Sequence, residues 1–81
     1  MSKIEKLLEK FKSIPKDLTW NELVKILNHL GYFEIKKKGK TGGSRVKFAN
    51  ENNDIISLHM PHPSNIVKQY VIRQLLEKLE L

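Results

Sequence analysis

Three short segments in which apolar and polar residues alternate constrain the fold of this chain more than any other feature. They read YFEIKKK at 32–38, SRVKFAN at 44–50 and IISLH at 55–59. The turn-forming runs GKTGG and ENND separate them. Alternating segments joined by such turns are typical of β-hairpins, so we predict a three-stranded antiparallel sheet.

The alternation assigns the side chains of these strands to two faces of the sheet. One face is apolar, and we expect it to carry Phe33, Ile35, Val46, Phe48, Ile56 and Leu58. The opposite face is polar, and we expect it to carry Glu34, Lys36, Arg45, Lys47, Ser57 and His59. An antiparallel sheet of this kind buries only its apolar face, so helices are expected on one side and an open polar face on the other.

Helical patterns precede the three strands. Residues 2–12 repeat apolar residues at helical spacing, and the segment LTWNELVKILNHLG at 18–31 does the same. In the second segment Thr19 and Glu22 form a capping-box pattern, and Gly31 is a natural C-terminal stop. We therefore predict two helices before the sheet, the second with well-defined ends.

A third helix is predicted after the sheet, over residues 66–79. We expect one side of it to carry Val67, Tyr70, Val71, Gln74, Leu75 and Leu79. The predicted order is α-α-β-β-β-α, which is an α+β fold. The chain has 81 residues, enough for one small core, so we expect a single domain spanning 1–81.

The charge of the chain indicates an anionic partner. The net charge is +6, and the basic residues concentrate in one uninterrupted stretch. That stretch contains Lys36, Lys37, Lys38, Lys40, Arg45 and Lys47. A local basic stripe of this kind favours nucleic acid as the partner.

The composition also excludes several classes of protein. The chain has no cysteine, which excludes a disulfide framework and a thiolate zinc site. It has no apolar run of the length of a signal peptide or a membrane span. We therefore expect a cytoplasmic protein with no membrane partner.

The sequence GKT and the histidine pair His59 and His62 invite two further interpretations. A phosphate-binding P-loop would require glycine at position 34, where the chain has Glu34, and a helix after the loop rather than a strand. A hairpin loop explains GKT better. Two histidines with no acid nearer than Asp54 are a poor ligand set, so we expect no metal and no cofactor.

Acid–base chemistry suits the two histidines better. RNA cleavage by the 2′-hydroxyl needs a proton acceptor, a proton donor and cations for the phosphate. His59 and His62 are candidates for the proton transfers, and Arg45 and Lys47 for holding phosphate. RNA binding without cleavage, or a charged face with no catalytic role, remains open. His29, near the end of the second predicted helix, is interpreted as structural.

The segments IPKDLTWNELVKILNHLGY, GYFEIKKKGKTGGSRVKF and SLHMPHP together resemble the HicA family, the toxins of HicBA toxin–antitoxin modules. The resemblance covers essentially the whole chain. It is closest to the longer bacterial version of these proteins, in which an extra N-terminal helix, here residues 1–14, precedes the core.

The resemblance implies a fold like that of double-stranded-RNA-binding domains and a metal-independent mRNA endoribonuclease. It also implies translation inhibition, growth arrest and neutralisation by a HicB antitoxin. Taken together with the acid–base chemistry of the chain's own histidines, it makes His59 and His62 the expected catalytic residues. The expected RNA-binding residues are Lys36, Lys37, Lys38, Lys40, Ser44, Arg45 and Lys47.

The chain departs from the family pattern at one position. Described members carry a histidine directly after the hairpin glycine, where this chain has Ser44 or Arg45, depending on the alignment. Serine is no unaided acid or base at neutral pH, and arginine stays protonated. Three explanations are compatible with this departure: His59 or His62 replaces that histidine, the chain is an inactivated variant, or the fold here binds only RNA and antitoxin.

Overall fold

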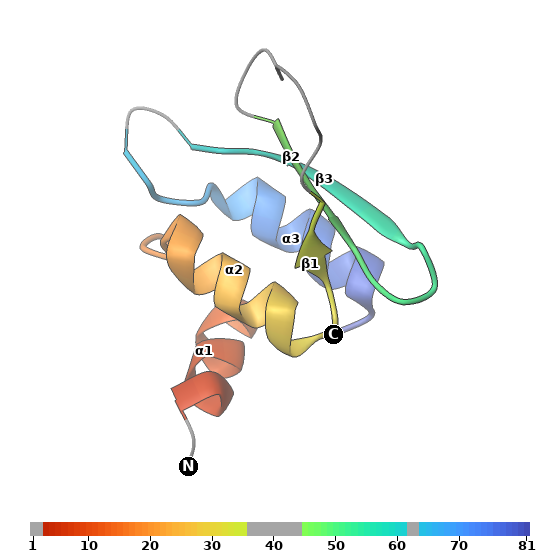
Figure 1. Cartoon of the computed structure of the whole chain (residues 1–81). Helices are drawn as coiled ribbons and strands as arrows, with labels where there is room; N and C mark the ends of the chain where they lie inside the picture. Colours follow the sequence, from red (N-terminus) through yellow and green to blue (C-terminus); the bar gives the residue numbers. More distant parts are fainter. Residues whose placement is uncertain (1–2, 36–44, 62–63) are drawn as a thin grey trace.

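The computed structural model contains three helices and three strands in the predicted order, α-α-β-β-β-α (Figure 1). They are α1 (Lys3–Lys12), α2 (Trp20–His29), β1 (Phe33–Glu34), β2 (Arg45–Ala49), β3 (Ile55–His59) and α3 (Gln69–Leu79). The structure describes residues 3–35, 45–61 and 64–81. The predicted α+β class is confirmed, while the likeness to double-stranded-RNA-binding domains stays a prediction.

Both ends of α2 are fixed by the residues that the sequence indicated. At the start, the Glu22 backbone N–H donates to Thr19 Oγ1 at 3.2 Å, and the Thr19 backbone N–H donates to Glu22 Oε1 at 3.0 Å. At the end, Gly31 has a φ of 92°, and the N–H of Tyr32 donates to the Leu27 carbonyl at 2.8 Å. These are a complete capping box and a Schellman turn, which satisfy backbone groups that the helix itself leaves unpaired.

The sheet has the strand order β1-β2-β3, with both pairs antiparallel. The residues of β3 alternate between exposed and buried, with Ile56 and Leu58 buried. In β2 the side chain of Phe48 is fully buried. The predicted inward and outward faces of β2 and β3 are therefore confirmed.

The prediction for the first strand was wrong in its phase. Glu34 pairs directly with Phe48, and directly paired residues share a face, so Glu34 belongs to the covered side of the sheet. Phe33 and Ile35 consequently belong to the open side, and both are exposed. The reason is that Tyr32 is buried and occupies the inward place ahead of them. Two adjacent aromatic residues fit the alternation in either phase.

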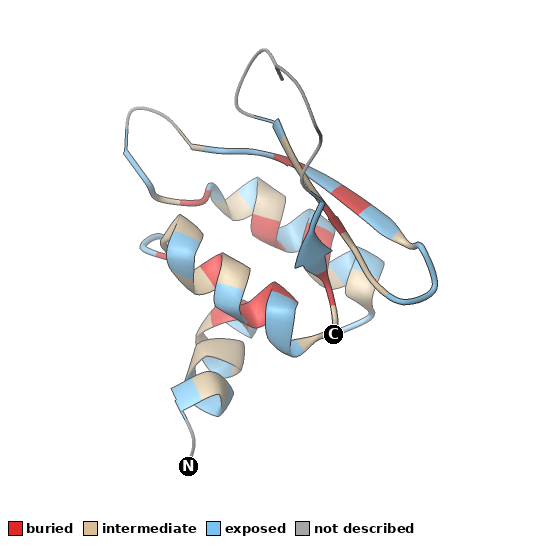
Figure 2. Ribbon diagram, viewed as in Figure 1, coloured by how far each residue is buried: buried red, intermediate tan, exposed pale blue. Residues whose placement is uncertain are grey.

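The core lies between the sheet and the helices α2 and α3, which cover the same face of the sheet (Figure 2). Its members come from all three helices, from β2 and β3, and from the segments beside the helices and strands. Helix α1 contributes one residue, the fully buried Phe11. The core residues are Phe11, Leu18, Leu23, Ile26, Leu27, Tyr32, Phe48, Ile56, Leu58, Val67, Ile72 and Leu75. A layer of helices on one face leaves the opposite face of the sheet open, as predicted.

The third helix begins later than predicted. Val67 is buried but extended, and its N–H donates to the Leu18 carbonyl at 2.7 Å. The helix itself starts at Gln69 and buries Ile72 and Leu75. Two residues that were expected on its inner side, Tyr70 and Gln74, are exposed. The hydrogen bond to the Leu18 carbonyl keeps Val67 out of the helix.

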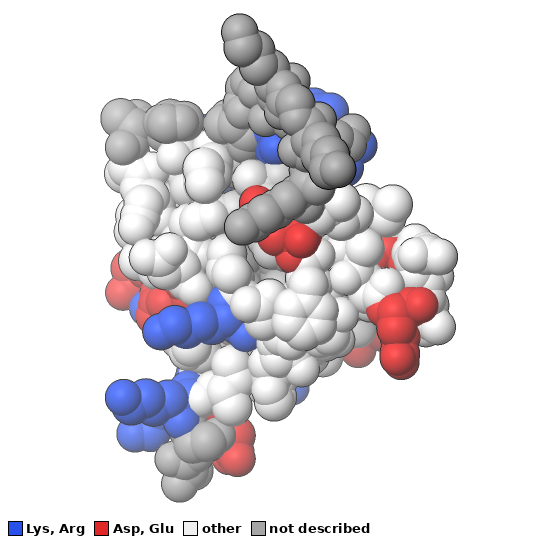
Figure 3. All heavy atoms as spheres, in the orientation of Figure 1, with Lys and Arg blue, Asp and Glu red and all other residues white. Residues whose placement is uncertain are grey.

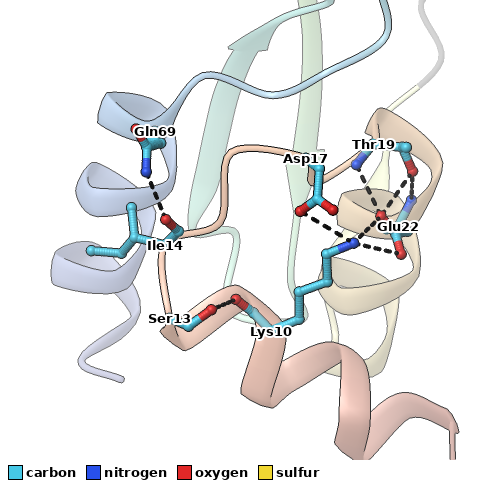
Figure 4. Close-up of polar contacts among 7 residues, drawn as sticks. All are labelled: Lys10, Ser13, Ile14, Asp17, Thr19, Glu22 and Gln69. Carbon is cyan, nitrogen blue, oxygen red and sulfur yellow. Dashed lines mark hydrogen bonds and ion pairs between the residues drawn. The ribbon is translucent and has the colours of Figure 1, made fainter.

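Helix α1 is held to the rest of the fold by its end and by one lysine (Figure 4). The Lys10 ammonium lies 3.2 Å from Glu22 Oε1 and 3.7 Å from Asp17 Oδ1. The side-chain amide of Gln69 donates to the Ile14 carbonyl at 2.8 Å. Ile14 has a φ of 53°, an unusual conformation for a β-branched residue, and it ends the helix where glycine is more common.

Polar contacts of Asp54, in the turn between β2 and β3, join this turn to Tyr32 before β1 and to Lys78 near the end of α3. The Tyr32 hydroxyl donates to Asp54 Oδ2 at 2.6 Å, and Lys78 Nζ donates to Asp54 Oδ1 at 3.1 Å. The hydrogen bond from Tyr32, followed by that from Lys78, lowers the pKa of Asp54. The hydrogen bond to Asp54 raises the pKa of Tyr32.

We predict that Thr19→Ala lowers the free energy of unfolding by about 1 kcal/mol, because it removes the side-chain cap of α2. Urea denaturation of both proteins measures the difference. Thr19→Ser keeps the accepting oxygen and should lose much less. Equal losses for alanine and serine would show that the hydroxyl does not stabilise the helix.

We further predict that acid destabilises the protein partly through Asp54. Its pKa is lowered by folding, so its contribution is present above the unfolded value of about 3.9 and is lost as the pH falls through the folded value. Asp54→Asn should therefore lose less stability than the wild type between about pH 6 and about pH 3 in urea denaturation. Glu51→Gln, an exposed change in the same turn, is the control and should behave like the wild type.

Candidate nucleic-acid interface

The strand register orders the side chains of the open sheet face into three rows of directly paired residues. The first row, at the hairpin end of β2 and β3, is Phe33, Ala49 and Ile55. The second row is Ile35, Lys47 and Ser57, with the Ile35 N–H donating to the Lys47 carbonyl at 2.8 Å. The third row is Arg45 and His59.

The third row contains the residues that could act chemically on RNA. Arg45 and His59 are exposed and directly opposite each other, and directly paired residues of antiparallel strands have Cα atoms about 4.5–5.5 Å apart. Lys47 is the diagonal neighbour of His59 on the same face. The fold thus brings an imidazole, a guanidinium and an ammonium group together on an accessible surface.

Three of the residues predicted for the site are therefore placed by the structure, and they lie together: Arg45, Lys47 and His59. The other predicted residues are Lys36, Lys37, Lys38, Lys40, Ser44 and His62, which lie outside the described residues. His29 is the last residue of α2 and is exposed there. The structural role interpreted for it stays a prediction.

The first row is apolar and was not predicted as a surface. Phe33 is 60% exposed and Ile55 is 51% exposed, with the small Ala49 between them. Exposed apolar groups that adjoin one another often mark an interaction site. The open face therefore has an apolar end and a basic end.

A pocket of about 280 Å³ opens at the same end of the sheet as His59. The start of α2, the end of β3 with the loop after it, and the start of α3 form its walls. The lining residues are Trp20, His59, Met60, Pro61, Val67, Lys68, Tyr70 and Val71. The sequence analysis did not predict this pocket, and it expected Tyr70, which is exposed, on the inner side of the third helix.

Basic side chains gather in two places on the face shown in Figure 3, near α1 and beside the start of β2.

Among the described residues, no three His, Cys, Asp or Glu side chains come close enough to hold a metal ion. Within the same part of the chain, no helix is long and apolar enough to cross a bilayer.

Comparison with known proteins identifies the family. The family model described as HicA toxin of bacterial toxin–antitoxin matches residues 20–81, which is more than half of the chain. No curated protein and no solved structure matches the chain significantly. The match begins at the first residue of α2, so α1 lies outside it, in agreement with the predicted extra N-terminal helix. The chain therefore belongs to the HicA toxin family of bacterial toxin–antitoxin systems.

Proposed function

We propose that this toxin is an endoribonuclease that cleaves mRNA on the open face of its sheet. The observation that carries the proposal is the pairing of His59 with Arg45, with Lys47 beside them. A titratable imidazole next to fixed cations on an exposed surface suits proton transfer at a phosphodiester.

In the proposed reaction a neutral imidazole accepts the proton of a ribose 2′-hydroxyl. The 2′-oxygen then forms a bond to the adjacent phosphorus, and the bond from phosphorus to the 5′-oxygen breaks. A protonated imidazole gives that leaving oxygen its proton, which leaves a 2′,3′-cyclic phosphate and a 5′-hydroxyl. We assign these two proton roles to His59 and His62.

The cations of the open face would stabilise the charge on the phosphate. Arg45 carries a planar fork of donors that matches two phosphate oxygens, and Lys47 adds a point charge. Histidines and fixed cations together supply the proton transfers and the charge stabilisation, so the proposed reaction needs no metal. Lys36, Lys37, Lys38, Lys40 and Ser44 belong to the same proposed RNA-binding surface.

A HicB-type antitoxin is the proposed protein partner. The apolar row of Phe33, Ala49 and Ile55 on the open face supports a protein contact there, because adjoining exposed apolar groups often mark protein interaction sites. An antitoxin bound to this row would lie beside Lys47 and the third row. We propose a single cytoplasmic domain that is held inactive in this way.

The position of Arg45 also favours a second candidate function, RNA binding without cleavage. Described HicA members have a histidine at or next to this place, and an arginine there holds phosphate but releases no proton. If His59 and His62 do not act, the open face remains a cationic surface for RNA. Measurement of cleavage separates the two candidates.

We predict that the purified protein cleaves mixed cellular RNA equally well with and without EDTA, and that its induction arrests growth. His59→Ala should lower the cleavage rate by about 10²–10⁴-fold, the usual contribution of a proton-transfer group. His29→Ala is the matched control, since it removes an exposed histidine from α2. Full cleavage by both His59→Ala and His62→Ala would refute the catalytic assignment.

We also predict that RNA affinity falls with salt and that Arg45 and Lys47 contribute to this dependence. Replacing either residue by alanine should reduce the slope of log affinity against log salt by about 0.7, the value for one phosphate of a single strand. Fluorescence anisotropy of a labelled RNA measures the slope. Lys12→Ala, an exposed change on α1, should leave the slope unchanged.

A further inference from the structure

We infer that the pocket between Trp20 and Tyr70 binds one unstacked nucleobase of the RNA, next to the phosphate held by the open face. This inference rests on the proposed RNA-binding function and adds a base-binding site to it. It concerns residues outside the three rows of the sheet, apart from His59, which belongs to both.

The volume and lining of the pocket suit a single ring system. Its volume of about 280 Å³ lies at the lower limit of small-ligand pockets, about 300 Å³, which fits a single ring system. The walls are mainly apolar and aromatic. The Trp20 ring is fixed from behind by Phe48, with ring centroids 6.1 Å apart. A fixed aromatic wall needs little ordering when a ligand binds.

Packing on the core does not account for Tyr70, which lines the pocket. Its side chain is 58% exposed, although it stands in the first turn of a helix whose other apolar residues pack on the core. Its hydroxyl has no hydrogen-bond partner among the described residues. Proteins that bind single-stranded RNA stack unpaired bases on exposed aromatic rings of this kind.

The charges around the pocket favour a nucleotide over an apolar ligand. Lys68 lines the pocket and also borders a second hollow of about 300 Å³, which Lys16 and Ser64 help to line. Among the described residues neither lysine has an ion-pair partner, and the first turn of α3 has no acidic residue. An aromatic slot beside two unpaired cations matches a base with its adjacent phosphate.

The pocket adjoins the proposed catalytic residue His59. His59 lines the pocket and pairs with Arg45 across the sheet. A base in the pocket would therefore fix the register of the strand and select which phosphate meets the imidazole. Tyr70 thus touches the base and sets the register of the strand, while the proton transfers belong to the histidines.

The test is an anisotropy titration with short RNAs that carry 2′-O-methyl groups and so have no nucleophile for cleavage. In one series each nucleotide in turn is replaced by an abasic sugar. The wild type should lose about 5- to 150-fold in affinity at one position, the value of one base-aromatic stack. Tyr70→Ala should bind the intact RNA more weakly by a similar factor and be insensitive to that abasic position. Tyr70→Phe keeps the ring and should match the wild type.

Gln74→Ala, one turn further along the exposed side of α3, is the control for the helix and should bind as the wild type does. The inference is overturned if the wild type binds RNA and Tyr70→Ala shows the same abasic profile. It is equally overturned if Tyr70→Ala weakens only the complex with the antitoxin. If the wild type binds no RNA, the proposed function fails first, and the inference fails with it.

Discussion

The fold depends on a short backbone bridge between two segments that are far apart in the sequence. The N–H of Trp20 donates to the Asn65 carbonyl at 2.8 Å, and the N–H of Val67 donates to the Leu18 carbonyl at 2.7 Å. This bridge ties the start of α2 to the approach of α3, so both helices lie on one face of the sheet. The two segments that it joins also carry Trp20 and Lys68, which both line the pocket.

Most of the architecture could be predicted from local sequence patterns that allow only one interpretation. The capping box at Thr19 and the stop at Gly31 fixed α2, and the alternation in β2 and β3 fixed their faces. The errors occurred where two local interpretations were equally good. Tyr32 and Phe33 both fit an inward position, and only the hydroxyl contact to Asp54 and the pairing with β2 decide between them.

The candidate site was predictable only in part for a similar reason. Arg45, Lys47 and His59 lie on strands, where alternation alone assigns a face, so the sequence could bring them together. The pocket has walls from three separate segments, and no period within one segment indicates it. The start of α3 was also misplaced in the prediction, because a tertiary hydrogen bond holds Val67 outside the helix.

The hydrogen bond from Gln69 to Ile14 joins residues 55 positions apart, and the bridge at Leu18 spans a similar length of chain. Contacts of such long sequence separation form late, since they require closure of a large loop. During synthesis the N-terminal helices leave the ribosome well before the segment that secures them. A chain without α3 lacks the last wall of the pocket and the hydrogen bond from Gln69 that holds the end of α1. Both features therefore form only after α3 has emerged from the ribosome.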